Sequence, residues 1–174
     1  MATKEEKQVV KPAVYMQFVN SKIKGTVTEA EHKNWVEVTN VKFDIQRHIH
    51  TQTGHSANRD MGKPEFSPMA VSKPLDAAGA LLAQEACSGQ PIDKVVIHFC
   101  KTGAKGLVIL QEITLSKVYL SDYGISTFND DHRAAESLSL NYSEIEIKGY
   151  NYDSAGNQQT PTVFAYSLTE AKPK

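Results

Sequence analysis

The sequence has few of the features that mark secreted, membrane-spanning or nucleic-acid-binding proteins. Among its 174 residues only Cys87 and Cys100 are cysteines, too few for a disulfide framework, and we expect two buried free thiols. No run approaches the roughly 20 apolar residues of a membrane helix. The start, MATKEEKQVV, is charged where a signal peptide needs an apolar segment. These absences predict a protein made and folded in the cytoplasm, without membrane insertion.

The chain also has no excess of charge of either sign. Lysine and arginine total 19 against 20 acidic residues, so no overall field attracts nucleic acid or an anionic membrane. Forty per cent of the residues are hydrophobic, enough for a packed core. The length fits a single domain over residues 1–174. Residues 1–12 form a polar arm that we expect to be flexible.

Strand patterns dominate what the sequence does contain. One helix is predicted within residues 73–91, with its N-cap near Ser72 or Lys73, Pro74 in the first turn, and Gly89 and Pro91 ending it. The remaining periodic segments alternate apolar and polar residues with a period of two. We therefore predict an all-β sandwich or barrel with one helix packed on it. The predicted strands lie in residues 13–19, 33–50, 92–100, 107–120, 135–147 and 161–171.

The stretch AESLSLNYSEIEI, residues 135–147, shows this alternation most clearly. Leu138, Leu140 and Tyr142 form one face, which we expect to fill the core. The polar face between them is compatible with a cleft, bulk water or a shared cavity. The phase changes near Ser143 and Glu144, which predicts that the strand bends there or changes its covered face.

Residues 51–66, TQTGHSANRDMGKPEF, have no periodicity and contain Gly54, Gly62 and Pro64. We predict a long loop. Loops of this length in compact domains are usually functional or disordered.

The histidines do not predict a metal site. His48 and His50 share a strand face with His55 within reach, but zinc needs three or four converging ligands. His98 and Cys100 also share a strand face, and such a pair on an apolar strand is more often packed than ligating. No metal and no cofactor are expected.

Catalytic motifs are incomplete as well. Ser126 lies in GISTF, where Phe128 replaces the second glycine of a nucleophile elbow and no helix follows. NYDSAGN lacks the later ligands of a calcium loop. Glu136 and Glu144 are not placed for a paired-acid mechanism. We expect no catalytic residues and no enzymatic activity.

Several stretches resemble, in order, the Hcp family of haemolysin-coregulated proteins, which form the inner tube of the bacterial type VI secretion system. The most specific is AAESLSLNYSEIEIKGYNYDSAG, residues 134–156. The others are IKG (23–25), HKNWVEV (32–38), PEFSPMAVSKPLDAAGALL (64–82), KVVIHFC (94–100) and LQEITLSKVYLSDY (110–123).

The resemblance implies a β-barrel of two packed antiparallel sheets with one helix at its side. It also implies six copies in a ring, rings stacked into a tube inside a contractile sheath, a spike protein at the tip, and small effector proteins in the lumen. The assembly is cytoplasmic and is secreted when the sheath contracts, without catalytic activity. The predicted ring-stacking residues are Gly54, His55, Arg59, Asp60 and Lys63. The strand face predicted to line the lumen or a subunit interface is Ser137, Ser139 and Asn141.

Two alternatives from other classes remain open at this point. One is a monomeric β-sandwich that binds a small ligand or carbohydrate in a pocket of its own, using Tyr119, Tyr123, Tyr150 and Tyr152. The other is a hydrolase that uses Ser126 or the histidines.

Overall fold

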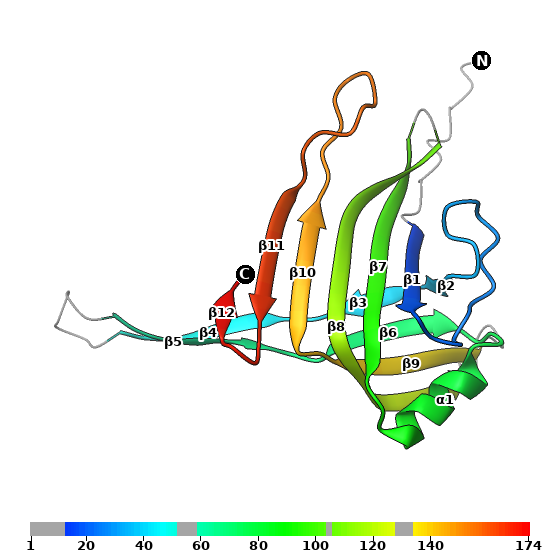
Figure 1. The fold of residues 1–174 in the computed structure, drawn as a ribbon, viewed down its shortest axis with the longest axis horizontal. Coiled ribbons are helices and arrows are strands. Elements are labelled where there is room, and N and C mark those ends of the chain that lie inside the picture. The colour runs from blue at the N-terminus through cyan, green and yellow to red at the C-terminus, as the bar shows by residue number, and fades with distance from the viewer. Residues whose placement is uncertain (1–12, 52–58, 104–105, 128–133) are drawn as a thin grey trace, which may run out of the picture.

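The computed structural model describes residues 13–51, 59–103, 106–127 and 134–174. Within them the chain is mostly strand with one helix, which confirms the predicted mainly β fold. Two antiparallel sheets pack together, and a two-strand hairpin projects from them (Figure 1). No helix in these ranges is long and apolar enough to cross a membrane.

The two sheets share one strand, β8. In spatial order the large sheet contains β12 (Lys172–Pro173), β11 (Thr162–Ser167), β10 (Glu144–Gly149), β8 (Gly106–Thr127), β7 (Ile92–Gly103), β1 (Ala13–Val19) and β2 (Val36–Val38). The small sheet contains β3 (Asn40–Lys42), β6 (Met69–Pro74), β9 (Ala134–Asn141) and the second half of β8. The projecting hairpin contains β4 (Ile45–Thr51) and β5 (Arg59–Phe66).

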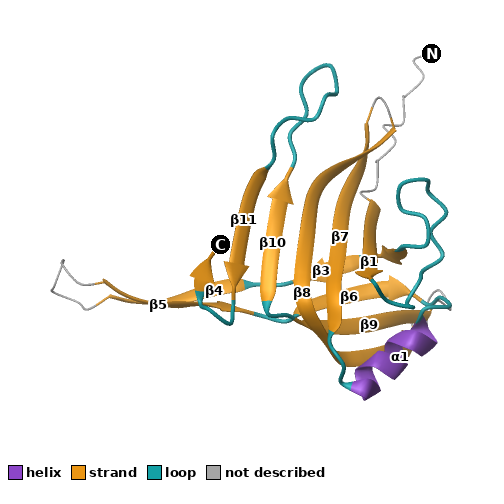
Figure 2. Ribbon diagram, in the orientation of Figure 1, coloured by secondary structure: helices purple, strands orange, loops and turns teal. Residues whose placement is uncertain are grey.

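Strand β8 turns the corner between the sheets (Figure 2). Its first half pairs with β7 and β10, and its second half pairs with β9. At the bend Lys117 has a left-handed φ of 52°, and the pairing with β9 shifts between Leu120 and Asp122. Such irregularities increase the local twist and bend of a strand, so one continuous segment serves both layers.

At the phase change near Ser143 and Glu144 the chain also passes from one sheet to the other. Strand β9 ends at Asn141 in the small sheet, and β10 begins at Glu144 in the large sheet. Ile145 is buried at 1% exposure, in the opposite phase from the apolar residues of β9. The predicted change of covered face is therefore confirmed.

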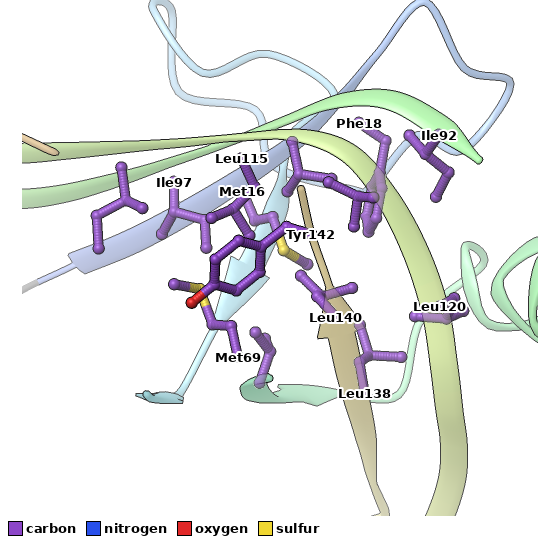
Figure 3. Packing of buried hydrophobic residues seen from close by; sticks show 14 of the residues in the cluster. Met16, Phe18, Met69, Ile92, Ile97, Leu115, Leu120, Leu138, Leu140 and Tyr142 are labelled. Carbon is purple, nitrogen blue, oxygen red and sulfur yellow. The ribbon is translucent and has the colours of Figure 1, made fainter. Parts of the chain in front are cut away.

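The core lies between the two sheets (Figure 3). Met16, Ile97 and Leu115 enter it from the large sheet, and Met69 and Leu140 from the small sheet, all fully buried. Leu138 and Tyr142 are buried beside them, as the alternation predicts. The Tyr142 hydroxyl donates to the Ser67 carbonyl at 3.0 Å, which satisfies the polar end of a buried ring.

The helix is shorter than the sequence predicts. Helix α1 spans Gly79–Ser88 with Ala78 at its N-cap, and Gly89 ends it in the left-handed conformation. The predicted start near Ser72 or Lys73 is wrong, because residues 69–74 form β6 and pair with β9. Strand pairing and burial of alternate residues outweigh the start signal of Pro74. Leu75, within the predicted helix range, lies before the observed helix and is 52% exposed.

Both cysteines are free, but only Cys100 is buried. Cys87 is exposed, which corrects the prediction of two buried thiols. It lies in the last turn of α1.

Candidate assembly surfaces

The outer face of the small sheet is flat and polar. Strand β9 turns Ser137, Ser139 and Asn141 away from the core, with Ser137 and Asn141 exposed. The register places Ala70 and Ser72 of β6 beside the two serines on one side. Small side chains therefore line the middle of this face, while the larger Tyr119, which is 45% exposed, lies opposite Asn141 at its end.

Strand β8 continues this face on the other side of β9. Gly124 lies opposite Ser137, and a Cβ at that glycine would be 2.9 Å from the serine Oγ. The Ser121 hydroxyl donates to the Ser139 carbonyl at 3.1 Å. The Ser121 hydroxyl thus binds the strand backbone and forms no catalytic pair.

The predicted loop of residues 51–66 is largely a strand. Residues 59–66 form β5, which pairs with β4 from Ile45↔Phe66 to Thr51↔Arg59. The loop prediction is wrong. Gly62 and Pro64 are residues typical of loops, and the strand belongs to neither packed sheet, so its sequence does not alternate apolar and polar residues. Pro64 is tolerated because β5 has a partner on one side only. We call the β4–β5 hairpin the projecting arm.

The base of the projecting arm is held firmly. Asp44 and Ser67 exchange two hydrogen bonds: the Asp44 amide donates to the Ser67 hydroxyl at 2.8 Å, and the Ser67 amide to the Asp44 carbonyl at 3.0 Å. The Phe66 ring stacks on Tyr166 of β11 at 4.8 Å between ring centres. The same Ser67 accepts the Tyr142 hydroxyl. The direction of the arm is therefore set by the body of the protein.

The outer part of the arm contains the predicted stacking residues that the structure describes. Arg59, Asp60 and Lys63 lie in β5, while Gly54 and His55 fall outside the described residues. Ile45 and Ile49 of β4 are 46% and 59% exposed. A two-strand hairpin is marginally stable alone in water. Exposed isoleucines on such a hairpin favour a surface that another chain covers.

Sequence reasoning missed a buried ion cluster beneath the helix. Lys73 of β6 and Glu136 of β9 lie opposite each other, both fully buried and paired as an ion pair. The Lys73 ammonium also contacts Asp76 Oδ1 at 2.7 Å. The Tyr123 hydroxyl donates to Glu136 Oε1 at 2.7 Å, and burial together with this carboxylate raises the pKa of Tyr123 to about 12. Every charge in the cluster is paired, as burial requires.

Gly79 makes this arrangement possible. It is the first residue of α1, and a Cβ there would overlap the Glu136 carboxylate and approach the Tyr123 hydroxyl at 3.1 Å. This glycine therefore lets the start of the helix lie directly over a buried carboxylate. Lys73 and Glu136 lie at strand positions that face the core. Alternation within each strand does not show that the two residues lie opposite each other.

Of the candidate catalytic and metal residues, His98 and Cys100 both lie near His32, whereas His48 and Ser126 lie elsewhere. His48 is 81% exposed and lies 3.7 Å from Glu65 on the arm. Ser126 lies in a regular part of β8, paired with Ala135, not at a sharp turn. No group of three or more histidine, cysteine or acidic residues within the described ranges is placed to hold a metal ion. Asp153 accepts backbone hydrogen bonds from Ala155 and Asn157, so its carboxylate closes a turn.

The four tyrosines proposed for ligand binding are scattered. Tyr119 is exposed on the small sheet, and Tyr123 contacts the buried ion cluster. The Tyr152 hydroxyl donates to the Ile109 carbonyl at 2.8 Å, and that of Tyr150 lies 3.5 Å from Glu112. A pocket of about 490 Å³ lies between the start of β7, the end of α1 and residues 19–23, and none of these tyrosines lines it.

Fold and surfaces together define a two-sheet β protein with a fixed projecting arm. The family model of the type VI secretion system effector Hcp matches residues 15–148. The chain therefore belongs to the Hcp family of the type VI secretion system. No curated protein matches it by sequence.

Solved structures show the same fold. "Structure of a type six secretion system protein" superposes with a TM-score of 0.85 at 22% identity, covering 94% of this chain and all of the other. Hcp1 from Salmonella typhimurium gives 0.73 at 16% identity, over 94% and 99% of the two chains. A type VI secretion system effector from Yersinia pestis gives 0.67 at 15% identity, over 88% and 98%. Each likeness covers most of both chains, and at these identities it shows a shared fold.

Proposed function

We propose that the protein is a structural subunit of the type VI secretion inner tube, with six copies in a ring and rings stacked within a contractile sheath. Membership of the Hcp family supports this role. The observation that carries it is the projecting arm. Its base is hydrogen-bonded to the body of the protein, its isoleucines are exposed, and it pairs with neither of the two packed sheets. Such an arm is stable when a second copy buries it.

In this proposal the outer face of the small sheet, with Ser137, Ser139 and Asn141, faces the lumen or a neighbouring subunit. A wall lined by these polar side chains suits the passage of small effector proteins, because it offers them hydrogen bonds. The spike protein and the sheath are the remaining partners. Export of the tube on sheath contraction places the protein outside the cell without enzymatic activity of its own.

The oligomeric state is the first test. Light scattering of the purified protein across micromolar concentrations should give the mass of six chains of 19.2 kDa. A head-to-tail ring closes at a defined number of copies, so the mass should not rise continuously with concentration. A strictly monomeric protein over the whole range would contradict the proposal.

The arm is tested by a charge at its exposed apolar position. In Ile49→Lys we expect hexamers to persist while stacks of rings and secreted protein are lost, because a buried lysine would have no partner in the stacking contact. Ile49→Val is the matched control and should retain both. Electron microscopy of the rings and the amount of protein in the culture medium measure the two outcomes. Dissociation of the hexamer itself would assign the arm to the contact within the ring.

A further inference from the structure

Two histidines meet where the loop of residues 20–35 crosses the outer face of the large sheet. His32 Nε2 lies 2.9 Å from His98 Nδ1. The other nitrogen of each ring meets a carboxylate: His32 Nδ1 is 2.6 Å from Glu29, and His98 Nε2 is 3.2 Å from Glu112. His32 is buried at 1% exposure. The four side chains form one continuous line from the loop to β8.

The number of hydrogens that this line needs is fixed by its geometry. Three contacts join the two carboxylates through the two rings, and each contact needs one hydrogen on a ring nitrogen. Two neutral imidazoles supply two hydrogens, which leaves one contact without a donor. One imidazolium and one neutral imidazole supply three. Two imidazoliums supply four and set two N–H groups against each other between His32 and His98.

The groups around the line preserve its charge balance. Lys148 of β10 holds the other oxygen of Glu112 at 3.0 Å. Burial raises the pKa of the Cys100 thiol to about 11, so this neighbour, 4.0 Å from His32, stays neutral. Tyr15 of β1 stacks on His32 with ring centres 4.6 Å apart, and burial raises its pKa as well. The remaining charged neighbours are Glu31 of the loop, which acts on His98, and Glu37 of β2, which acts on Tyr15.

A second proton is opposed in the folded state. Burial lowers the pKa of His98 below its ordinary value of 6.5, although the Glu112 carboxylate acts in the other direction. The unfolded chain takes up this proton near pH 6.5, whereas the folded chain does so only at lower pH. Stabilisation from this source is therefore complete above pH 6.5 and is lost as the pH falls through the folded value.

We propose that His32 and His98 share one proton, which holds the loop of residues 20–35 against the large sheet through hydrogen bonds. Uptake of a second proton would break this contact. The loop leads directly into β2, the edge strand of that sheet. Acidification would thus loosen the contact between the loop and the outer face of the sheet, while Val36 and Val38 of β2 stay buried in the core. This inference does not depend on the tube assignment, because it concerns the chain itself.

Trp35 provides a direct readout, because it is the only tryptophan of the chain. Its ring centre lies 4.6 Å from that of His98 and 4.8 Å from that of His32. An imidazolium beside an indole quenches its fluorescence. Between pH 8 and 5 we expect a fluorescence transition with its midpoint below 6.5, and faster amide hydrogen exchange in residues 20–35 below that midpoint, with unchanged far-ultraviolet circular dichroism.

Three variants assign the transition. His98→Gln should abolish it, and Glu112→Gln should move its midpoint down by about one pH unit, because the carboxylate favours the cation. His48→Gln, on the exposed arm, is the matched control and should leave the midpoint unchanged. Were His98→Gln not to fold, the shift in Glu112→Gln would decide alone. Fluorescence that is flat over this range, or a midpoint that neither variant moves, overturns the proposal.

Discussion

Lys73→Met should lower the free energy of unfolding by about 3–5 kcal/mol, among the largest losses that one substitution in this chain produces. Methionine fills most of the volume, so packing is largely kept. The variant removes the cation that pairs with the fully buried Glu136, and Asp76 loses its contact at 2.7 Å. An uncompensated carboxylate in the interior is the source of the loss.

The double variant Lys73→Met/Glu136→Gln separates charge from packing. Glutamine keeps an acceptor for the Tyr123 hydroxyl but carries no charge. We expect it to recover about 1–2 kcal/mol of the loss, because contacting residues are not additive. Urea unfolding at one fixed protein concentration measures both variants, since assembly would shift the apparent stability.

A surface lysine supplies the control for this pair. Lys172 contacts Glu170 with both side chains more than half exposed. Lys172→Met should change stability by less than about 0.5 kcal/mol, since solvent screens such pairs. A Lys73→Met protein as stable as the parent would show that the buried cluster contributes no more than a surface pair.

Gly25→Ala should be the second severe change, costing on the order of 3 kcal/mol. A Cβ at this position would lie 2.6 Å from both the Trp35 carbonyl carbon and the Val36 Cα. Both atoms belong to backbone, so no side-chain rotation relieves the overlap. The Gly25 amide donates to the Asn34 carbonyl at 2.9 Å, and this close crossing of the two loop ends would open.

Gly149→Ala is the matched control for Gly25→Ala. It lies in β10, and no atom stands within 4 Å of the Cβ position. We expect a change within about 0.5 kcal/mol. Thermal unfolding of the two variants side by side tests the difference. Equal changes in stability at both glycines would show that the backbone at residues 25 and 35 can move apart at little cost.

The corner between β9 and β10 shows how far alternation alone can reach. Leu138, Leu140 and Tyr142 were assignable to the core because a half-buried strand repeats every two residues. The phase change at Ser143 and Glu144 likewise marked the passage between sheets. The family assignment rested on the same region, where the order of residue types is most specific.

The projecting arm and the helix start show where local patterns stop. In β5 Gly62, Lys63 and Glu65 are exposed, and its sequence lacks the alternation that identified the other strands, so pairing with β4 is what makes it a strand. Residues 69–74 carry a helix-start signal, yet their pairing with β9 prevails. Both cases depend on a partner distant in the sequence.

Residue type and order along the chain were enough for the mainly β class, the core face of residues 138–142 and the family, because each of these follows from a pattern within single segments. The tertiary structure alone decided the buried pairing of Lys73 with Glu136 and the line of Glu29, His32, His98 and Glu112. These groups lie up to 66 residues apart within one contact. Hydrogen bonds and ion pairs need atoms within about 3 Å, and only folding brings such distant side chains to that distance.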